Sequence, residues 1–148
     1  MRVLVSACLL GARCRYDGAC KPLPGLERLL DAADPVPVCP EQLGGLPTPR
    51  TPAERCGRFV VARDGTDVTA QYERGAQEAL RLAQLTGCTL AVLKEKSPSC
   101  GCGRIYDGTH TGQLTDGNGV TAELLLQNGI LVFGESQLDE LLEWIKKA

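Results

Sequence analysis

The sequence predicts an α/β protein with three layers (α/β/α), in which helices cover both faces of a mostly parallel, Rossmann-like sheet. Short apolar runs with strand character alternate along the chain with amphipathic helical segments. The runs at residues 2–7, 36–38 and 89–93 are apolar on both faces, as central parallel strands are. The 148 residues fit a single domain, 1–148, and their 43% hydrophobic content is ordinary for one globular core.

The first two predicted strands are separated by a loop and a short helix. Residues 2–7 form the first strand, and the Asp-Gly pair within residues 16–18 is typical of a tight turn in the loop that follows. Leucines at helical spacing predict a helix that Pro35 ends, at Leu26, Leu29 and Leu30. The second strand covers residues 36–38.

Residues 39–52 are dense in proline and glycine, which disfavours helix and sheet interior and indicates an ordered functional loop or lid. Residues 59–61, followed by Asp64-Gly65, suggest a small hairpin beside it. Thr69 is placed to cap a helix with one apolar stripe that closes at Gly87. Residues 89–93 then give the third strand.

The last part of the chain repeats the strand and helix alternation. We expect Thr121 to cap a helix that ends at Asn128-Gly129, and residues 130–133 to form a fourth strand. A final helix is predicted from Ser136, with Asp139 in a capping-box-like position. Its expected buried side chains are Leu138, Leu141, Leu142 and Ile145.

The charge balance and the termini exclude some classes of function. The net charge is −2 and there is no long run of like charge, so we expect no nucleic-acid partner. The apolar run after Met1 is too short for a signal peptide, and nothing approaches a membrane span. We therefore expect a cytoplasmic protein with no membrane partner.

The cysteine count is the strongest compositional signal. Eight cysteines in a reducing compartment are more consistent with metal ligation or thiol chemistry than with a disulfide framework. His110 is the only histidine, so a ligand set would be rich in thiolates. Such a set favours iron–sulfur or zinc.

Three cysteines follow the three apolar runs: Cys8, Cys39 and Cys100. The carboxyl ends of parallel strands lie along one edge of the sheet, where such folds bind ligands, so these cysteines can converge. Cys88 instead begins a strand and is expected to pack in the core. The remaining cysteines lie in loops, as spectators, redox partners or alternative ligands: Cys14, Cys20, Cys56 and Cys102.

Two further side chains lie in the cysteine loops. Glu41, two residues after Cys39, is either a solvated carboxylate or a general base beside the metal. Ser97 precedes a proline in the loop of Cys100 and is either a turn hydroxyl or a functional one. We expect solvated arginines at Arg50, Arg55 and Arg58, although an arginine in the lid could balance a thiolate-bound cluster. No phosphate-binding or dinucleotide-binding glycine motif occurs.

The ordered set of motifs resembles the family called domain of unknown function 523, whose characterised members are thiouracil desulfidases. The motifs span nearly the whole chain: Ser6-Ala7-Cys8-Leu9-Leu10-Gly11, Cys14-Arg15-Tyr16-Asp17-Gly18, Val38-Cys39-Pro40-Glu41, Pro49-Arg50, Asp67-Val68-Thr69, Ser97-Pro98-Ser99-Cys100-Gly101 and Gly119-Val120-Thr121-Ala122. The resemblance implies a [4Fe-4S] cluster held by Cys8, Cys39 and Cys100. It also implies that Glu41 and Ser97 take part in catalysis.

The implied reaction is the non-redox removal of sulfur from a thiolated nucleobase, which turns 2-thiouracil into uracil and hydrogen sulfide. The open iron would act as Lewis acid and sulfur acceptor, Glu41 would activate water or carry protons, and Ser97 would orient the substrate. The sequence does not fix which thio-compound is the substrate, and Cys102 could offer its sulfur in place of Cys100. We expect a monomer or a weak homo-oligomer.

Two other functions remain open at this point. A zinc or iron–sulfur module could sense metal or redox state without turnover, and a zinc form would be colourless where a cluster is brown. A thiol reductase could use Cys100 and Cys102, and it would show a titratable dithiol with no metal dependence.

Overall fold

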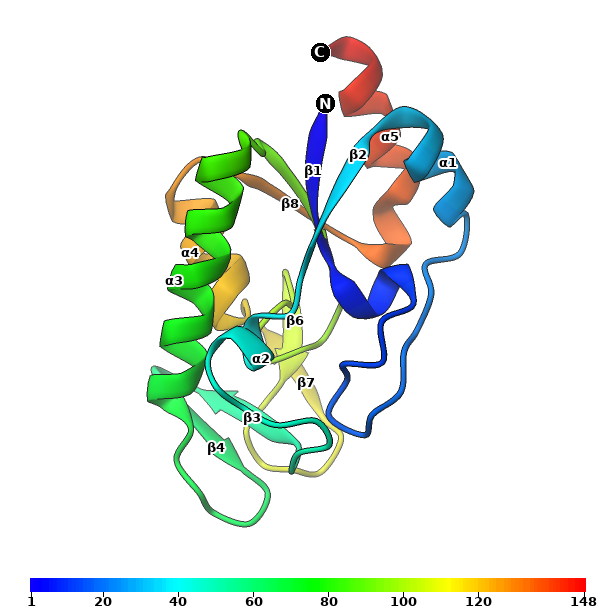
Figure 1. The fold of residues 1–148 in the computed structure, drawn as a ribbon. Helices are drawn as coiled ribbons and strands as arrows, with labels where there is room; N and C mark the ends of the chain where they lie inside the picture. The colour runs from blue at the N-terminus through cyan, green and yellow to red at the C-terminus, as the bar shows by residue number, and fades with distance from the viewer.

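A computed structural model describes residues 1–148 and has the three layers that the sequence predicts (Figure 1). Four parallel strands form the central sheet in the order β2-β1-β5-β8. Their bounds are Arg2–Ser6 for β1, Asp34–Val38 for β2, Leu90–Leu93 for β5 and Leu131–Gly134 for β8. The predicted fold class is therefore confirmed, and the central sheet is parallel throughout.

The helices divide between the two faces of this sheet. The α-helices are α1 (Leu26–Ala32), α2 (Pro40–Leu43), α3 (Thr69–Thr86), α4 (Val120–Gln127) and α5 (Leu138–Lys147), and two short 3-10 helices are η1 (Ala7–Leu10) and η2 (Glu135–Gln137). In Figure 1, α1 and α5 lie on one side of the sheet, and α3 and α4 lie on the other. No helix is both long and apolar enough to span a membrane.

Alternating side chains of the strands build two cores. Val3 and Val5 of β1 face the core shared with α1 and α5, whereas Leu4 between them faces the core shared with α3 and α4. All three side chains are fully buried. This explains why the run is apolar on both faces, because successive side chains of a strand point to opposite faces and both are covered.

The connections out of β1 and β5 leave the sheet on opposite faces. The chain after β1 leads to α1, and the chain after β5 leads to α4, which packs with α3 on the other face. Adjacent parallel strands whose connections diverge in this way leave a crevice at their carboxyl ends. The fold thus places a binding site between the loops that follow β1 and β5.

Two small antiparallel hairpins lie at this end of the sheet (Figure 1). They pair β3 (Ala53–Cys56) with β4 (Phe59–Ala62), and β6 (Arg104–Tyr106) with β7 (Leu114–Asp116). The predicted strand at 59–61 is confirmed, but its partner precedes it in the chain. Asp64-Gly65 forms a separate turn, in which the Ala62 N–H donates to the Thr66 carbonyl at 2.8 Å.

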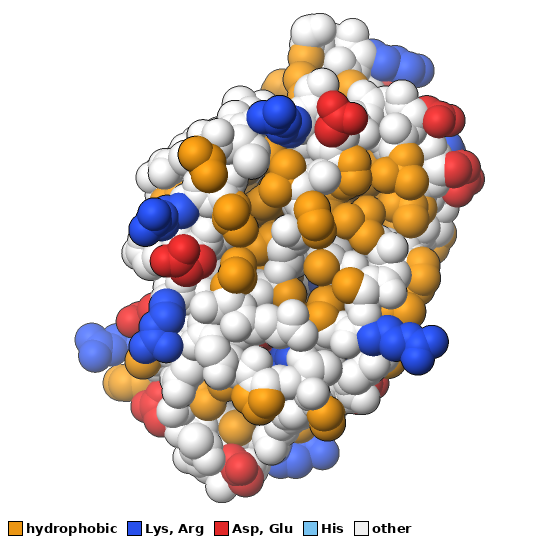
Figure 2. Space-filling model, in the orientation of Figure 1, with side chains coloured by type: hydrophobic (Ala, Val, Ile, Leu, Met, Phe, Trp, Pro, Cys, Tyr) orange, Lys and Arg blue, Asp and Glu red, His pale blue; other side chains and the backbone are white.

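The outer strand β2 carries two prolines, Pro35 and Pro37. Proline lacks the N–H that a neighbouring strand would need, so these residues suit an edge strand and discourage pairing with another chain. Figure 2 shows apolar side chains gathered on the face of the molecule where β2 lies in Figure 1, with charged side chains around them.

The short helix α2 corrects the expectation that residues 39–52 contain no helix. Pro40 occupies the first position of this helix, where proline costs little because its missing N–H has no partner there in any case. The rest of the segment is irregular, as predicted.

The predicted helix caps at Thr69 and Thr121 are both wrong. Asp67 accepts the Thr69 N–H at 2.9 Å, while the Thr69 hydroxyl accepts the Val60 N–H at 2.8 Å and ties α3 to β4. Thr121 is fully buried inside α4, 2.8 Å from the Ser99 hydroxyl. Each threonine therefore connects two elements instead of capping a helix.

The final helix also begins differently from the prediction. α5 starts at Leu138 after η2, and the Gln137 side chain, not Asp139, accepts the Gly134 N–H, at 2.8 Å. Asp139 pairs with Arg28 at 2.7 Å and joins α5 to α1. Leu138 and Leu141 are buried as predicted, and Leu142 and Ile145 pack against the same core from its edge.

Candidate functional site

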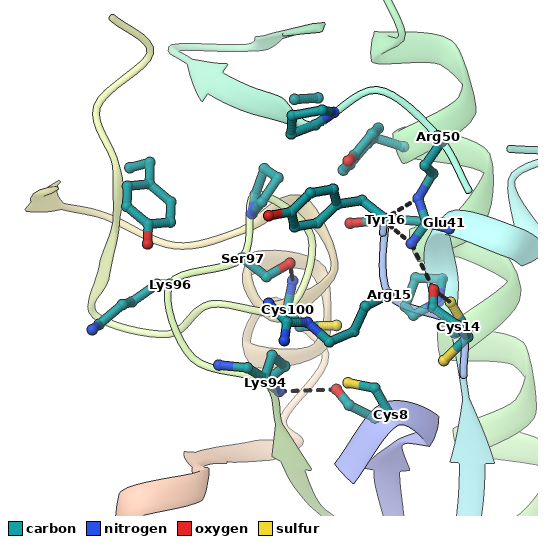
Figure 3. Close-up of a pocket in the computed structure, with 18 of the residues that line it drawn as sticks. Cys8, Cys14, Arg15, Tyr16, Glu41, Arg50, Lys94, Lys96, Ser97 and Cys100 are labelled. Atoms are coloured by element: carbon teal, nitrogen blue, oxygen red, sulfur yellow. Dashed lines mark hydrogen bonds and ion pairs between the residues drawn. The ribbon is translucent and has the colours of Figure 1, made fainter. Parts of the chain in front are cut away.

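A cavity of about 620 Å³ lies at the carboxyl ends of the parallel strands. Four cysteines line it: Cys8, Cys14, Cys39 and Cys100. Figure 3 shows Cys8 and Cys100 on opposite walls, with Glu41 and Arg50 further along the same space. The cavity therefore occupies the crevice between the loops after β1 and β5.

Each predicted cysteine reaches the cavity from a different element. Cys8 lies in η1 directly after β1, Cys39 lies between β2 and α2, and Cys100 lies in the loop after β5. Cys14 comes from the loop after η1, and its carbonyl oxygen is 3.8 Å from the Cys39 sulfur. The structure brings together the three cysteines that the strand ends predict and adds a fourth.

Burial raises the pKa of three of these thiols, those of Cys8, Cys14 and Cys100. Burial, and next the neighbouring Cys39, raises the pKa of Cys8 to about 11. Burial, followed by Cys39 and Cys8, raises the pKa of Cys14 to about 12. Burial also raises the pKa of Cys100 well above its usual range, although a hydrogen bond from Ser6 opposes it. A bound metal would have to displace these protons, because thiolates are the metal ligands.

The spacing of the donors fits a multinuclear cluster better than a single ion. Nowhere in the chain do three or more histidine, cysteine, aspartate or glutamate side chains lie close enough to share one metal ion. A cubane cluster is different, because each thiolate binds its own iron and the thiolates can stand further apart. The donor set is thus three or four soft thiolates spread around a cavity, which suits iron–sulfur chemistry.

The other cysteines lie outside the cavity. Cys102, two residues after Cys100, points toward the Val132 carbonyl oxygen at 3.9 Å, and Cys88 is buried in the core beneath α3, as predicted. Cys100 is therefore the member of the Cys-x-Cys pair that faces the cavity. A dithiol made by Cys100 and Cys102 has no support from this arrangement.

Two glycines hold α2 against α3 and so position Cys39 and Glu41. A Cβ atom on Gly75 of α3 would lie 1.9 Å from the Pro40 carbonyl oxygen, and one on Gly44 would lie 1.9 Å from the Gln71 carbonyl oxygen. These backbones approach closely enough that only glycine fits at either position. The packing fixes α2, and with it the Glu41 carboxylate that this helix carries.

Glu41 is not a solvated carboxylate. Its side chain is 14% exposed and forms an ion pair with Arg50, whose side chain is 7% exposed. The Arg50 Nε donates to the Glu41 Oε2 at 2.7 Å. The expectation that Arg50 is solvated is therefore wrong, because the proline-rich loop folds this arginine inward over the cavity.

Tyr72 of α3 lies against the same carboxylate. It is 3% exposed and lines the cavity. Burial, and next the negative charge of Glu41, raises the pKa of Tyr72 far above its usual range. The phenol thus remains protonated beside Glu41.

The Ser97 hydroxyl has a defined orientation. Its oxygen accepts the backbone N–H groups of Ser99 and Cys100, both at 3.0 Å. A hydroxyl oxygen has two acceptor sites, so these contacts leave its O–H as the group available to the cavity. Ser97 also fixes the backbone of Cys100, which connects the serine directly to a cavity thiol.

Arg55 also differs from expectation. Its guanidinium is 2.7 Å from Glu123 and donates to the Asn118 carbonyl at 2.6 Å, so it joins β3 to α4 away from the cavity. Arg58 lies over the Phe59 ring at 5.0 Å, near the exposed end of the hairpin. Arg50 is therefore the one member of the three predicted solvated arginines that lines the cavity.

Three residues of this cavity were not among the predicted site residues, although Cys14 was named as an alternative ligand and a lid arginine as a counter-charge for the cluster. Cys14 lies six positions after Cys8 in the same loop, which is a usable signal, but its direction depends on the fold of that loop. Arg50 was expected to be solvated, and its signals are the Pro49-Arg50 motif and its place in the lid. Tyr72 belongs to the apolar stripe of α3 and was expected to be an ordinary core residue.

Comparison with known proteins gives concordant matches. Residues 3–137 match the 2-thiouracil desulfurase family. The uncharacterised protein YbbK of Bacillus subtilis (strain 168) is 42% identical over 150 residues, covering 95% of this chain and 99% of YbbK. The solved structure of the [4Fe-4S]-dependent thiouracil desulfidase TudS (DUF523Vcz) is 48% identical, with a TM-score of 0.95 and 99% of each chain covered.

Proposed function

The chain belongs to the 2-thiouracil desulfurase family, and from this we propose that it is a [4Fe-4S]-dependent desulfidase that acts on a 2-thiouracil-like base. The reaction is hydrolytic: 2-thiouracil and water give uracil and hydrogen sulfide. Neither carbon nor sulfur changes its oxidation state, so no external reductant is needed. The observation that carries the proposal is the convergence of Cys8, Cys39 and Cys100 on one cavity that also contains Glu41 and Ser97.

We assign the cluster to Cys8, Cys39 and Cys100. They lie in the loops after three neighbouring strands, at the crevice where such folds bind ligands. When bound, a cluster held by three thiolates supplies an open iron that acts as Lewis acid and as sulfur acceptor. Cys14 is a fourth cavity thiol and is not needed in this assignment.

Ser97 orients the base by donating its hydroxyl proton. Both acceptor positions of the Ser97 oxygen are occupied by backbone N–H groups, so the O–H can serve a carbonyl or ring nitrogen of the substrate. The same contacts hold Ser97 in place before the substrate arrives. The serine therefore selects the orientation of a planar heterocycle and does not act as the nucleophile.

Glu41 activates the attacking water and carries its proton. Its Oε2 is occupied by Arg50, and Oε1 is not engaged by that arginine. The protonated Tyr72 hydroxyl lies against this carboxylate and hydrogen-bonds to it. A carboxylate so placed is a suitable general base, because it is fixed in position and borders the cavity.

We place this chemistry in one domain, 1–148, in the cytoplasm. An open iron is vulnerable to oxidation, and the reducing cytoplasm protects both the cluster and free thiols. The substrate is a small thiolated base, without nucleic acid or membrane, and the chain acts as a monomer or a weak homo-oligomer. A metal sensor without turnover is the alternative that the experiment below separates from this proposal.

The test is to reconstitute the chain with iron and sulfide under anaerobic conditions and to follow 2-thiouracil. We expect a brown protein with about four irons and four sulfides per chain, as a [4Fe-4S] cluster requires. It should release one hydrogen sulfide for each uracil formed. A brown protein that gives no sulfide would support the sensor, and a colourless zinc protein would contradict the cluster assignment.

A further inference from the structure

Arg50 uses every hydrogen-bond donor that its guanidinium has. Nε donates to Glu41, and Nη1 donates to the Pro47 carbonyl at 3.2 Å and to the Thr48 hydroxyl at 3.0 Å. Nη2 pairs with Glu41 and donates to the Cys14 carbonyl at 2.8 Å. A guanidinium has five N–H groups, and all five are accounted for. Arg50 therefore has no donor left for a substrate.

These contacts tie three segments of the cavity wall together. The guanidinium joins the carboxylate on α2 to the loop that carries Cys14, and the Arg50 backbone N–H donates to the Tyr16 carbonyl in that same loop at 2.7 Å. Both ends of the residue thus hold the loop after β1. The side chain is 7% exposed, so water does not compete for these bonds.

The contact with Glu41 is one-sided. Nε donates to Oε2 at 2.7 Å, and Nη2 also pairs with Oε2. Two nitrogens of the planar guanidinium on one oxygen hold that oxygen in place. Rotation of Glu41 about its last bond would break both contacts at once.

Building on the function proposed above, we propose that Arg50 is a positioning residue for that reaction, which clamps Glu41 through Oε2 and holds its carboxylate in one orientation at the cavity. Arg50 itself does not touch the substrate. The alternative is a purely structural clamp, in which Arg50 only holds the loops of Cys14 and Tyr16. The two differ in whether the effect of losing Arg50 depends on Glu41.

The experiment compares Arg50→Lys and Arg50→Ala with Glu41→Gln and with the Arg50→Ala/Glu41→Gln double variant. Arg55→Ala is the matched control, because Arg55 also joins a carboxylate and a carbonyl but lies outside the cavity. All proteins are reconstituted anaerobically. Iron and sulfide content, thermal melting, kcat and KM for 2-thiouracil are measured for each.

We expect both Arg50 variants to keep a full cluster and to lose about 10²-fold in kcat, with KM within a few-fold, because a misplaced catalytic group costs about that much. Arg50→Lys should not restore the rate, since an ammonium has three donors and no planar fork. Added guanidinium should recover part of the kcat of Arg50→Ala, whereas methylammonium should not. In the Glu41→Gln background, the loss of Arg50 should have almost no further effect, and Arg55→Ala should keep the wild-type kcat.

Several results would overturn the positioning role. If the losses in kcat of the two single variants multiply in the double variant, Arg50 acts independently of Glu41. A fully active Arg50→Lys would show that the planar guanidinium is not needed. Loss of iron in Arg50→Ala would assign the residue to the assembly of the site. If the wild type itself releases no sulfide, the proposed function fails instead. The crystal structure of Arg50→Ala then decides the positioning role, which requires Glu41 to have turned from its wild-type orientation.

Discussion

The two ends of the central sheet are built from the same four strands but carry different chemistry. At the amino end, Cys88 precedes β5 and is buried in an apolar core beneath α3, where it behaves as a small hydrophobic residue. At the carboxyl end, Cys8, Cys39 and Cys100 line a cavity beside an ion pair. The residue type is the same, and its position relative to the strand decides its role.

The difference follows from the topology of the parallel sheet. Chain connections diverge at the carboxyl ends of β1 and β5, so a crevice opens there. No such divergence occurs beneath Cys88, where α3 and α4 close over the strands. A cysteine can therefore be assigned to packing or to chemistry from its place in the sheet, and the first prediction below tests this assignment.

The largest effect is expected from exchanging one thiol at each end of the sheet. Cys39→Ser should lose the cluster and all detectable sulfide release, because a serine hydroxyl is a poor ligand for iron in a thiolate set. Cys88→Ser should keep iron and turnover and lose only stability. Iron content and sulfide release are measured after anaerobic reconstitution. Iron near the wild-type level in Cys39→Ser would refute the comparison.

A second prediction separates catalysis from ligation at the carboxyl end. Glu41→Gln removes the proposed base but keeps the size of the side chain, so the cluster should assemble while kcat falls about 10²–10⁴-fold. Glu123→Gln is the control, because Glu123 also pairs with an arginine, Arg55, but lies away from the cavity. Turnover of 2-thiouracil is followed in both. Activity of Glu41→Gln within a few-fold of wild type would assign proton transfer to another group.

The close contact between α2 and α3 predicts that replacing a helix glycine with alanine lowers the stability of the protein, the reverse of the usual effect. Glycine to alanine inside a helix normally stabilises a protein by about 0.5–1 kcal/mol. Gly75→Ala should instead destabilise by about 1–3 kcal/mol, as overpacking does, since the new Cβ would meet the Pro40 carbonyl oxygen at 1.9 Å. Urea unfolding measures the change, with the exposed Gln77→Ala as control. A more stable Gly75→Ala protein would contradict the packing described here.

The smallest effect is expected at Ser97. Ser97→Ala removes one neutral hydrogen bond to the substrate and two to the loop, so we expect about a 10-fold loss in kcat/KM with the cluster intact. The Ser99 hydroxyl bonds to the buried Thr121 and not to the cavity, so Ser99→Ala should lower the melting temperature and leave kcat/KM almost unchanged. Equal catalytic losses in both variants would mean that Ser97 only supports the loop.

The sequence was sufficient to predict the architecture because the apolar patterns of the strands and helices agreed with the positions of the turns between them. The apolar run of β1 alternates between two buried faces, and the glycines and prolines mark the connections. The cap at Thr69 failed because Asp67, two residues earlier, accepts the Thr69 N–H, while the Thr69 hydroxyl accepts the Val60 N–H of the neighbouring strand. Sequence spacing does not rank such contacts, since they depend on which strand lies beside the helix start.

The site was predicted as far as strand ends determine it. Cys8 and Cys39 directly follow their strands, so the edge of the sheet fixes their location. Arg50 was expected to be solvated because no local periodicity reports that its irregular, proline-rich loop folds it inward. Tyr72 fitted an apolar helical stripe, and only the tertiary structure reveals that its hydroxyl end meets Glu41.

The most direct measurement of the central assignment is an anaerobic crystal structure of the reconstituted chain, with the iron atoms located by anomalous scattering. We predict a four-iron cluster at the carboxyl ends of the strands, bonded to Cys8, Cys39 and Cys100, with one iron free of any cysteine. A fourth bond to Cys14, a ligand from Cys102, or a single metal ion in the cavity would contradict the account.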